Sequence, residues 1–309
     1  MNEELSIIMY HYVRPINKSK FPDLKGREVS EFLSQLDYLA SNYTFVSVDE
    51  INYSIKKGSK LPPNACWLTF DDGYKDHLQY VLPALKKRGI QGAFFPPSRA
   101  IQNYELLNVN AVHFILAAGI SIHRLVVLLD SMCIQNGVAP KNIEKFKKLY
   151  GKPNRWDCAE TIYFKRMLQH ALAPDLRTQI IADLFSEILG VSPIDFARDL
   201  YMNVNELRTL VNEGMYVGSH GAAHLWLDKC SKEEQIFDIR ESLHLLEDVG
   251  APTRDWVMCY PYGAYNRDSI DVIKKLSCSI GITTNPRVSR LRCDSQFELP
   301  RFDTNDFPI

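Results

Sequence analysis

Two short polar segments of the sequence carry the side chains that a metal-dependent hydrolase needs. In a TFDDG segment, the carboxylates of Asp71 and Asp72 follow an apolar run. In an HGAAH segment far downstream, His220 and His224 lie four residues apart. Two imidazoles and one carboxylate can hold a catalytic metal ion with one position left open, and a second carboxylate can act as a base on the water that the ion activates. These four side chains therefore predict metal-assisted hydrolysis.

Each segment also has an ordinary structural interpretation when it is considered alone. Asp-Asp-Gly is a common turn sequence, since Gly73 readily adopts the conformations that turns require. A pair of histidines four residues apart can arise by coincidence or can be a hydrogen-bonded pair at the end of a strand. The residues around the histidines favour the metal site, because small side chains leave space for a cation and a substrate near the backbone: Gly218, Ser219, Gly221, Ala222 and Ala223.

Short apolar runs that alternate with helical patterns surround both segments. Strands are predicted at residues 5–10, 45–48, 65–70, 92–95, 215–218, 256–260 and 279–283. Helices are predicted at about residues 30–41, from residue 50 onward, and at residues 81–88, 232–250 and 267–276, with N-caps at Ser30, at Ser47 or Asp49, at Ser231 and at Asn266. The alternation predicts about six or seven parallel β/α units in a closed or nearly closed barrel. Both polar segments then lie at the carboxyl ends of strands, where such barrels carry out their chemistry.

Residues 98–205 interrupt this alternation between the Asp and His segments. Their apolar runs, such as residues 125–129 and 180–185, suggest helices, and the scarcity of Gly and Ser repeats argues against a disordered linker. We therefore expect a barrel built from residues 1–97 and 206–309 and a helical insertion at residues 98–205. The insertion is expected to pack against the barrel, to pack against a second subunit of a homo-oligomer, or to act as a lid.

The composition of the chain excludes several classes of function. Of the 309 residues, 46% are hydrophobic, which allows one large core or two ordinary ones. A formal net charge of −1 supplies no basic field for nucleic acid or anionic lipid, and the seven cysteines include no CxxC pair and are expected to be reduced thiols. The sequence has no run of about eighteen apolar residues that would span a membrane. Its first residues lack the apolar core of a signal peptide, so we expect a cytoplasmic protein, or an exported one if a leader has been removed.

A third segment, YPYG, which ends at Gly263, makes a family resemblance specific. With TFDDG, HGAAH and YPYG in this order, the chain outside the insertion resembles the polysaccharide deacetylase family, the NodB-homology carbohydrate esterases. The resemblance implies an α/β fold, a distorted, TIM-like (β/α)7 barrel, here with the helical insertion. It assigns Asp71 as the catalytic base and Asp72, His220 and His224 as ligands of a divalent metal ion. That ion is commonly zinc, and cobalt, nickel or iron also suit these donors.

The chain departs from the family pattern at two motif positions. Cys259 stands where the family usually has an arginine that orients the base, and a thiol cannot make that charge-assisted hydrogen bond. Arg301 is a candidate substitute, with an exposed structural arginine as the alternative. Gly221 replaces the usual Ser or Thr, which removes a hydrogen bond that stabilises the loop. The resemblance also implies that Tyr262 contributes its backbone N–H to an oxyanion hole.

The late histidine that gives many family members their general acid has no counterpart, because the last histidine of the chain is His244. Some members resemble circular permutations in which an N-terminal strand supplies this histidine. His11, at the end of the first predicted strand, fits that variant, so we assign it as the general acid. The alternative is a core histidine bonded to a backbone carbonyl. No role is assigned to the remaining histidines, which are expected at surface or packing positions: His77, His113, His123, His170 and His244.

The residues and the resemblance together favour removal of the acetyl group from an acetamido sugar. The substrate would be a polysaccharide, an oligosaccharide or a glycan precursor that bears an N-acetyl group, and acetate would be released. One alternative is hydrolysis of a non-sugar amide or a cyclic imide on the same barrel. A second alternative, motivated by Cys259 and the missing late histidine, is a catalytically silent glycan-binding protein. The presence of both Asp71 and Asp72 argues against the second alternative.

Overall fold

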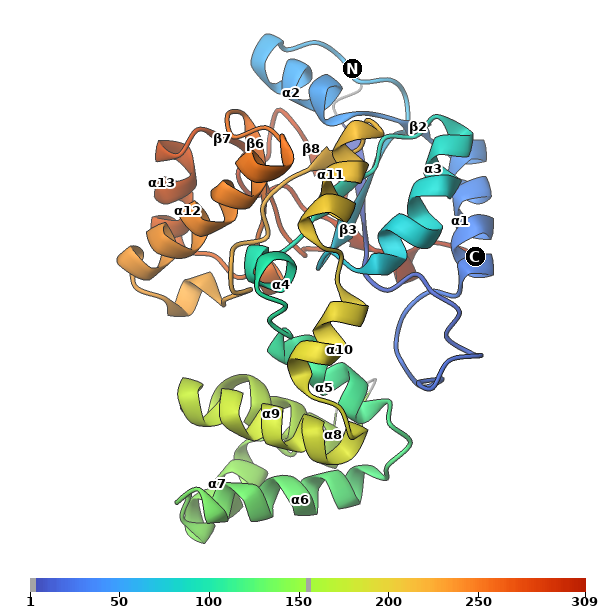
Figure 1. The fold of residues 1–309 in the computed structure, drawn as a ribbon. Helices are drawn as coiled ribbons and strands as arrows, with labels where there is room; N and C mark the ends of the chain where they lie inside the picture. Colours follow the sequence, from blue (N-terminus) through green and yellow to red (C-terminus); the bar gives the residue numbers. More distant parts are fainter. Residues whose placement is uncertain (1–3, 154–156) are drawn as a thin grey trace. The chain divides into compact units, whose positions relative to one another are not determined.

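In a computed structural model of the protein, the described residues, 4–153 and 157–309, form two compact units (Figure 1). One unit, called here the sheet unit, consists of the described residues of Met1–Arg14, Gly26–Glu105 and Arg198–Ile309. The other unit, called here the helical unit, consists of Pro15–Lys25 and the described residues of Leu106–Ala197. Residues 1–3 of the expected barrel and residues 154–156 of the expected insertion lie outside the described residues.

The centre of the sheet unit is the strand β3 (Ala65–Asp71), which is buried along its whole length. Its parallel neighbours are β1 (Glu4–Tyr10) on one side and β4 (Ala93–Phe95) on the other, and β5 (Tyr216–Val217) pairs with β4. The sequences of β1 and β3 are almost continuously apolar, as is usual for parallel strands with both faces covered. β2 (Thr44–Phe45) pairs with the start of β3 and is shorter than the predicted run, because a helix cap follows it. The carboxyl ends of these strands share one edge, where the Asp and His segments begin.

Strands β6 (Trp256–Cys259) and β7 (Cys278–Ile282) form a second parallel pair. A single bridge between Ser219, just after β5, and Met258 of β6 joins this pair to the larger sheet. The predicted strands in these two places are confirmed, each within one residue of its expected ends. Strand order therefore continues from β5 to β6 and β7.

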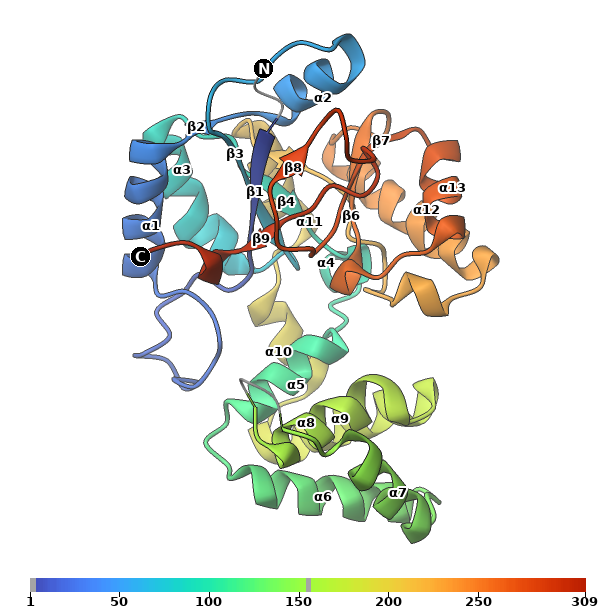
Figure 2. The same cartoon turned by 180° about the vertical axis from the view of Figure 1, so that it is seen from behind.

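The C-terminal segment returns to the first strand. Leu299 bridges to Ile282 of β7, and β9 (Phe302–Asp303) then pairs with β1 and lies beside it in Figure 2. Before that return, β8 (Ser289–Arg290) pairs with the start of β1 in antiparallel orientation. The pairings thus follow the order β1, β3, β4, β5, β6, β7, β9 and β1 again, with single bridges at two joints. The predicted α/β fold with a mainly parallel sheet is thus confirmed.

The helices of the sheet unit follow its strands, as parallel β/α units require. They are α1 (Val29–Asn42), α2 (Val48–Lys57), α3 (Leu82–Arg88), α4 (Ser98–Gln102), α11 (Val204–Asn212), α12 (Lys232–Val249) and α13 (Arg267–Lys275). The predicted N-caps Ser47, Ser231 and Asn266 are confirmed, because each side chain accepts the backbone N–H of the third helical residue. The N-cap predicted at Ser30 is wrong, since Glu28 caps α1. Among the described residues, no helix is long and apolar enough to cross a lipid bilayer.

The helical unit contains no strand among its described residues. It is built from α5 (Asn108–Leu116), α6 (Ile122–Gln135), α7 (Pro140–Tyr150), α8 (Ala159–Arg166), α9 (Pro174–Leu189) and the first part of α10 (Pro193–Leu200). Pro15–Lys25 joins this unit through Phe21, whose ring centroid lies 4.9 Å from that of Phe114 and 6.1 Å from that of Phe196. The main segment of this unit, Leu106–Ala197, thus begins later and ends earlier than the predicted insertion at residues 98–205. The unit also includes Pro15–Lys25, which lies outside the predicted bounds.

Alternate residues of the strands build the core of the sheet unit. Ala65 and Trp67 of β3 belong to this core together with side chains of the other strands: Leu5, Ile7, Ala93, Phe95, Val257, Cys259, Ile280 and Ile282. Successive side chains of a strand point to opposite faces, so Thr69 and Asp71 continue the inward row that Ala65 and Trp67 begin. The aspartate that ends β3 therefore lies at the end of the core and not on a surface loop.

Candidate active site

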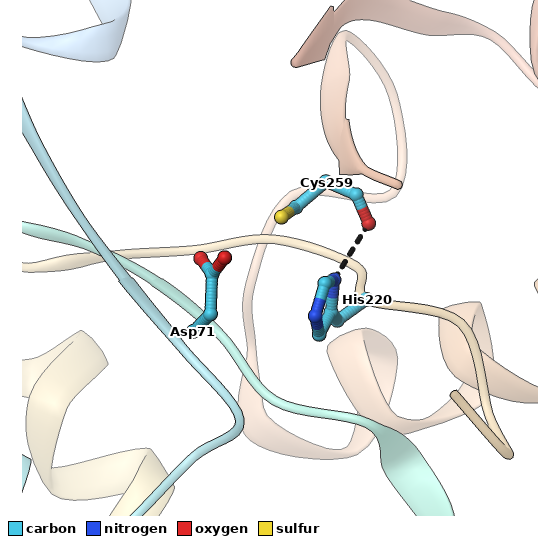
Figure 3. A group of neighbouring side chains, drawn as sticks. All are labelled: Asp71, His220 and Cys259. Atoms are coloured by element: carbon cyan, nitrogen blue, oxygen red, sulfur yellow. Dashed lines mark hydrogen bonds between the residues drawn. The ribbon is translucent and has the colours of Figure 1, made fainter. Parts of the chain in front are cut away.

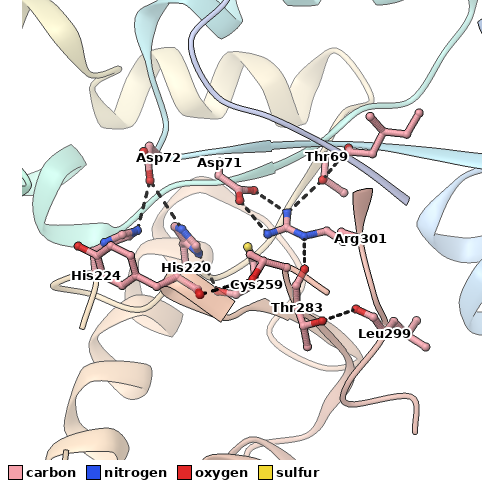
Figure 4. A network of polar contacts seen from close by, with 12 residues as sticks. Thr69, Asp71, Asp72, His220, His224, Cys259, Thr283, Leu299 and Arg301 are labelled. Atoms are coloured by element: carbon pink, nitrogen blue, oxygen red, sulfur yellow. Dashed lines mark hydrogen bonds and ion pairs between the residues drawn. The ribbon is translucent and has the colours of Figure 1, made fainter. Parts of the chain in front are cut away.

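The carboxylate of Asp71 is clamped by a buried arginine. Arg301 donates from one Nη to each carboxylate oxygen of Asp71, at 2.9 Å in both cases (Figure 4). Each of the two residues is only 1% exposed. Burial alone would raise the pKa of Asp71, but the charge and hydrogen bonds of Arg301 hold it well below its usual range. Asp71 is therefore a charged carboxylate in a site from which water is largely excluded.

Two threonines hold the guanidinium of Arg301 in place. Its Nε donates to the carbonyl of Thr283 at 2.8 Å, and Nη1 also donates to Thr69 Oγ1 at 3.1 Å. The alternative of an exposed structural arginine is therefore wrong. Arg301 places its charge beside Asp71, as the family's usual motif arginine would, although it comes from a different segment of the chain.

Cys259, which stands where the resemblance expects that arginine, also faces Asp71 (Figure 3). Asp71, His220 and Cys259 form a buried group whose possible ligand atoms lie within 4.8 Å of one another. Burial raises the pKa of the Cys259 thiol well above its usual range, and the Asp71 carboxylate raises it further. The thiol is therefore neutral, and the positive charge beside Asp71 comes from Arg301.

Asp72 faces the histidine pair. Its φ of 70° lies in the left-handed region, which lets the two adjacent carboxylates point to different partners. Asp72 Oδ1 lies 3.6 Å from Nε2 of His220 and 3.5 Å from Nε2 of His224. Tyr74 donates its hydroxyl to the other carboxylate oxygen, Oδ2. The structure thus brings the three expected ligands together in one buried group, with ligand atoms within 4.8 Å of one another.

Both imidazoles present Nε2 to Asp72 and are neutral. Nδ1 of His220 donates to the carbonyl of Cys259 at 2.7 Å, which leaves a lone pair on Nε2 (Figure 3). Burial lowers the pKa of His220. Burial and the nearby His220 together lower the pKa of His224 to about 3. Two neutral imidazole nitrogens and a carboxylate oxygen are donors that divalent cations bind, so these residues fit a metal ion.

Asp238 of α12 holds the loop between the two histidines. Its carboxylate accepts the backbone N–H of Ala222 at 3.0 Å and that of Ala223 at 2.8 Å. Gly221 has a φ of 69°, and a Cβ atom at this position would lie 2.5 Å from Asp238 Oδ2. The structure therefore gives a steric reason for the glycine where the family usually has Ser or Thr, and Asp238 supplies hydrogen bonds that stabilise the loop.

His11 follows β1 and acts electrostatically on both aspartates. Burial raises the pKa of each aspartate, and the nearby His11 has the opposite effect on both. The carbonyl of His11 accepts a hydrogen bond from Nε2 of His77 at 2.9 Å. His77 is fully buried at the start of a π-helical turn, His77–Val81, as expected for a packing position.

Tyr262 and Trp226 form an aromatic wall beside His224. Tyr262 lies in the turn Pro261–Gly263 with a φ of 59°. Its ring centroid lies 4.5 Å from that of His224 and 4.2 Å from that of Trp226, on which it stacks. His224 and Tyr262 share a positive φ with Asp72. Residues other than glycine rarely adopt this conformation, and it often marks functional sites. Trp226 was not predicted as a site residue, although its place two residues after the HGAAH segment is a usable signal.

The remaining histidines lie elsewhere, as expected for surface and packing positions. The side chains of His123 and His244 are 77% and 68% exposed. His113 and His170 belong to the helical unit.

The family model for polysaccharide deacetylases matches residues 58–124 and 196–280 of the chain. The chain belongs to the polysaccharide deacetylase family. The matched segments of this family member carry its TFDDG, HGAAH and YPYG motifs. His11 and Arg301 lie outside both segments, so the matched segments give no support for their roles.

Individual relatives agree with the family assignment. YxkH of Bacillus subtilis (strain 168), which is named a polysaccharide deacetylase, is 28% identical over 120 residues, or 38% of this chain and 41% of YxkH. The match thus covers less than half the length of that relative. Two solved structures have the same fold at a TM-score of 0.59, and each alignment covers 98% of this chain and 93% of the other. They are the Streptococcus pyogenes deacetylase PplD in complex with acetate, at 15% identity, and IcaB from Ammonifex degensii, at 17% identity.

Proposed function

We propose that the protein is a metal-dependent hydrolase that removes the acetyl group from an acetamido sugar and releases acetate. One observation above all carries the proposal: Asp72 Oδ1 lies 3.6 and 3.5 Å from the Nε2 atoms of His220 and His224. The charged carboxylate of Asp71 lies beside this group. Family membership supports a carbohydrate substrate with an N-acetyl group, in a polysaccharide, an oligosaccharide or a glycan precursor.

Asp72, His220 and His224 would hold the metal ion, most simply zinc, although cobalt, nickel or iron also suits these donors. When bound, such an ion polarises the acetyl carbonyl and lowers the pKa of a water molecule. The Tyr74 hydroxyl orients Asp72, and the carbonyl of Cys259 orients the ring of His220. Groups of this kind behind the ligands fix their direction and tautomer.

Three further groups are proposed to act on the reacting atoms. Asp71 takes a proton from the attacking water, and its pair with Arg301 fixes the direction of its two oxygen atoms. The backbone N–H of Tyr262 stabilises the oxyanion of the tetrahedral intermediate. His11 gives a proton to the departing nitrogen, because an amide nitrogen leaves poorly as an anion.

Reaction products distinguish this proposal from its two alternatives. Hydrolysis of a cyclic imide or another non-sugar amide would proceed without acetate release from an N-acetylhexosamine. A catalytically silent glycan-binding protein would bind glycan and release no acetate in the metal-loaded state. The contact between Arg301 and Asp71 favours catalysis, because it restores beside the base the positive charge that Cys259 cannot supply.

Two variants test the roles of the base and the ligands separately. Wild-type protein is expected to contain about one divalent ion per chain by elemental analysis. Asp71→Asn should keep the ion and lose acetate release from N-acetylated sugars by about 10²–10⁴-fold, whereas His220→Ala should lose both. As a control, His123→Ala changes an exposed histidine and should alter neither. Wild-type activity in Asp71→Asn would show that Asp71 is not the base. Full metal content in His220→Ala would show that His220 is not a metal ligand.

A further inference from the structure

The exposed side of α7 carries a row of lysines. The helix contains four lysines and a single acidic residue, Glu144, although the net charge of the whole chain is only −1. Lys141, Lys145 and Lys148 are exposed and are spaced by four and three residues, so they lie on one side of the helix. None of the three forms an ion pair with another described residue. Glu144 instead lies 3.8 Å from Lys147. Three uncompensated positive charges are therefore neighbours on this surface.

Exposed apolar side chains accompany the lysines. Leu149 is 54% exposed and lies four residues after Lys145, so the two are neighbours on the surface of α7. On α6, Val127 and Ile134 are 54% and 49% exposed. Among the described residues, seven large hydrophobic side chains are exposed, and three of them lie on these two helices. The helical unit thus exposes apolar and basic groups on the same pair of helices.

An ion pair joins the two helices beside these apolar side chains. Lys147 Nζ of α7 lies 2.6 Å from Asp130 Oδ2 of α6, and the helices are adjacent in both views (Figures 1 and 2). Val127 and Ile134 lie three residues before and four residues after Asp130, so both are its neighbours on the surface of α6. The exposed sides of α6 and α7 therefore adjoin at this ion pair. Together they form what is called here the basic-apolar face: Val127, Ile134, Lys141, Lys145, Lys148 and Leu149.

This combination of groups suits the surface of an anionic lipid bilayer. Lysine side chains near such a bilayer are attracted by its negative surface potential. Exposed aliphatic side chains can leave water by entering the boundary between the head groups and the acyl chains. A nucleic acid or another soluble polyanion would also attract the lysines, but it offers no apolar phase for a side chain such as that of Leu149. A face that combines both kinds of group therefore favours the bilayer.

We propose that the basic-apolar face of the helical unit is a docking surface for an anionic lipid bilayer. The inference goes beyond the proposed hydrolysis and does not depend on it, because the proposed catalytic residues and metal ligands belong to the sheet unit. Attachment of this kind needs no membrane-spanning helix, since the docking helices lie at the surface of the bilayer. A net charge of −1 counted over the whole chain excludes a broad basic field, but it does not exclude a local face of this kind.

Vesicle binding tests this docking surface. The whole chain is mixed with vesicles of phosphatidylcholine alone, or of phosphatidylcholine and phosphatidylglycerol in equal parts, and bound protein is measured by co-sedimentation. Wild type should bind the anionic vesicles and not the neutral ones. Each lysine near an anionic surface contributes about fivefold in affinity. The triple variant Lys141→Gln, Lys145→Gln and Lys148→Gln should therefore bind the anionic vesicles about 100-fold more weakly than wild type.

A second triple variant is the matched control for the loss of charge. Lys57→Gln, Lys60→Gln and Lys87→Gln together remove the same charge from exposed positions of the sheet unit. This variant should bind the anionic vesicles as wild type does. Equal losses of affinity in the two triple variants would overturn the docking surface. So would wild-type protein that binds neither kind of vesicle, or that binds both equally.

Leu149→Asn tests the apolar part of the face while it keeps every lysine. It should bind the anionic vesicles about fivefold more weakly, because the exposed part of the leucine no longer leaves water on binding. Thermal unfolding should be the same as in wild type for all three variants, since every altered side chain is exposed. Wild-type affinity in Leu149→Asn would indicate a site for soluble polyanions such as nucleic acid, and it would overturn the proposal.

Discussion

Asp71 and Asp72 are neighbours in the chain, but they face different partners. Asp71 ends β3 on the inward face, where both of its oxygens accept hydrogen bonds from Arg301. Asp72 has a φ of 70° and faces the neutral rings of His220 and His224. A fixed cation beside one carboxylate and ligand nitrogens beside the other give the pair two environments. Different environments of this kind allow one carboxylate to act as a base while its neighbour holds a cation.

His11→Gln is expected to slow amide hydrolysis much more than ester hydrolysis. A general acid contributes about 10²–10⁴-fold when the leaving group must be protonated, and an amide nitrogen must be. An aryl acetate releases a stabilised phenolate and does not need that proton. The measurement compares kcat for an N-acetylglucosamine oligomer with kcat for 4-nitrophenyl acetate. His244→Gln, at an exposed site, serves as the control. Equal losses with both substrates would show that His11 does not act on the leaving group.

At the scale of elements, a two-residue strand determines where Arg301 lies. β9 pairs Phe302 with Ile8 of β1, and Leu299 has already bridged to β7. Arg301 lies between these two attachments, so its side chain reaches the inward face of β3. The ion pair joins residues 230 positions apart in the chain. The environment of the base therefore depends on how the C-terminal segment returns to the first strand.

Arg301→Met is expected to lower both stability and turnover. It keeps a long apolar side chain but leaves the Asp71 carboxylate buried without its cation, and breaking a buried pair in this way costs about 3–5 kcal/mol. Arg301→Lys keeps the charge but cannot make the bidentate hydrogen bonds to Asp71. It should be less destabilised than Arg301→Met while still losing turnover. Urea unfolding and acetate release measure the two effects. Wild-type turnover in Arg301→Met would mean that Arg301 does not position the base.

Features with causes close by in the sequence could be predicted, and features that depend on distant pairing could not. Ser231 and Asn266 were predicted as N-caps because the residues that they cap follow within one turn. The convergence of the Asp and His segments could be expected because parallel strands end at one edge. Arg301 could only be a candidate, since β9 is too short to show a periodic pattern. Phe21 joins the helical unit through ring contacts that no local pattern reveals.

At the scale of the whole molecule, each of the two units has its own core. The sheet unit packs around strand residues such as Trp67. In the helical unit, the ring of Phe196 lies 4.7 Å from that of Phe114 and 5.1 Å from that of Phe185, measured between centroids. The proposed ligands and catalytic residues all belong to the sheet unit. Stabilisation by a bound ion should therefore begin in that unit.

Zinc is expected to protect the sheet unit, and not the helical unit, from local unfolding. An ion that binds only the folded state stabilises it by about 2.7 kcal/mol at a concentration of 100 times Kd. Hydrogen exchange followed by mass spectrometry should show slower exchange in β3 and α12 on zinc addition and no change in α6 and α9. His220→Ala should abolish the effect. Phe114→Ala, which costs about 3–5 kcal/mol for a buried aromatic ring, should speed exchange in α6 and α9 while zinc still protects β3. Equal zinc protection of α6 and β3 would mean that the two units unfold as one.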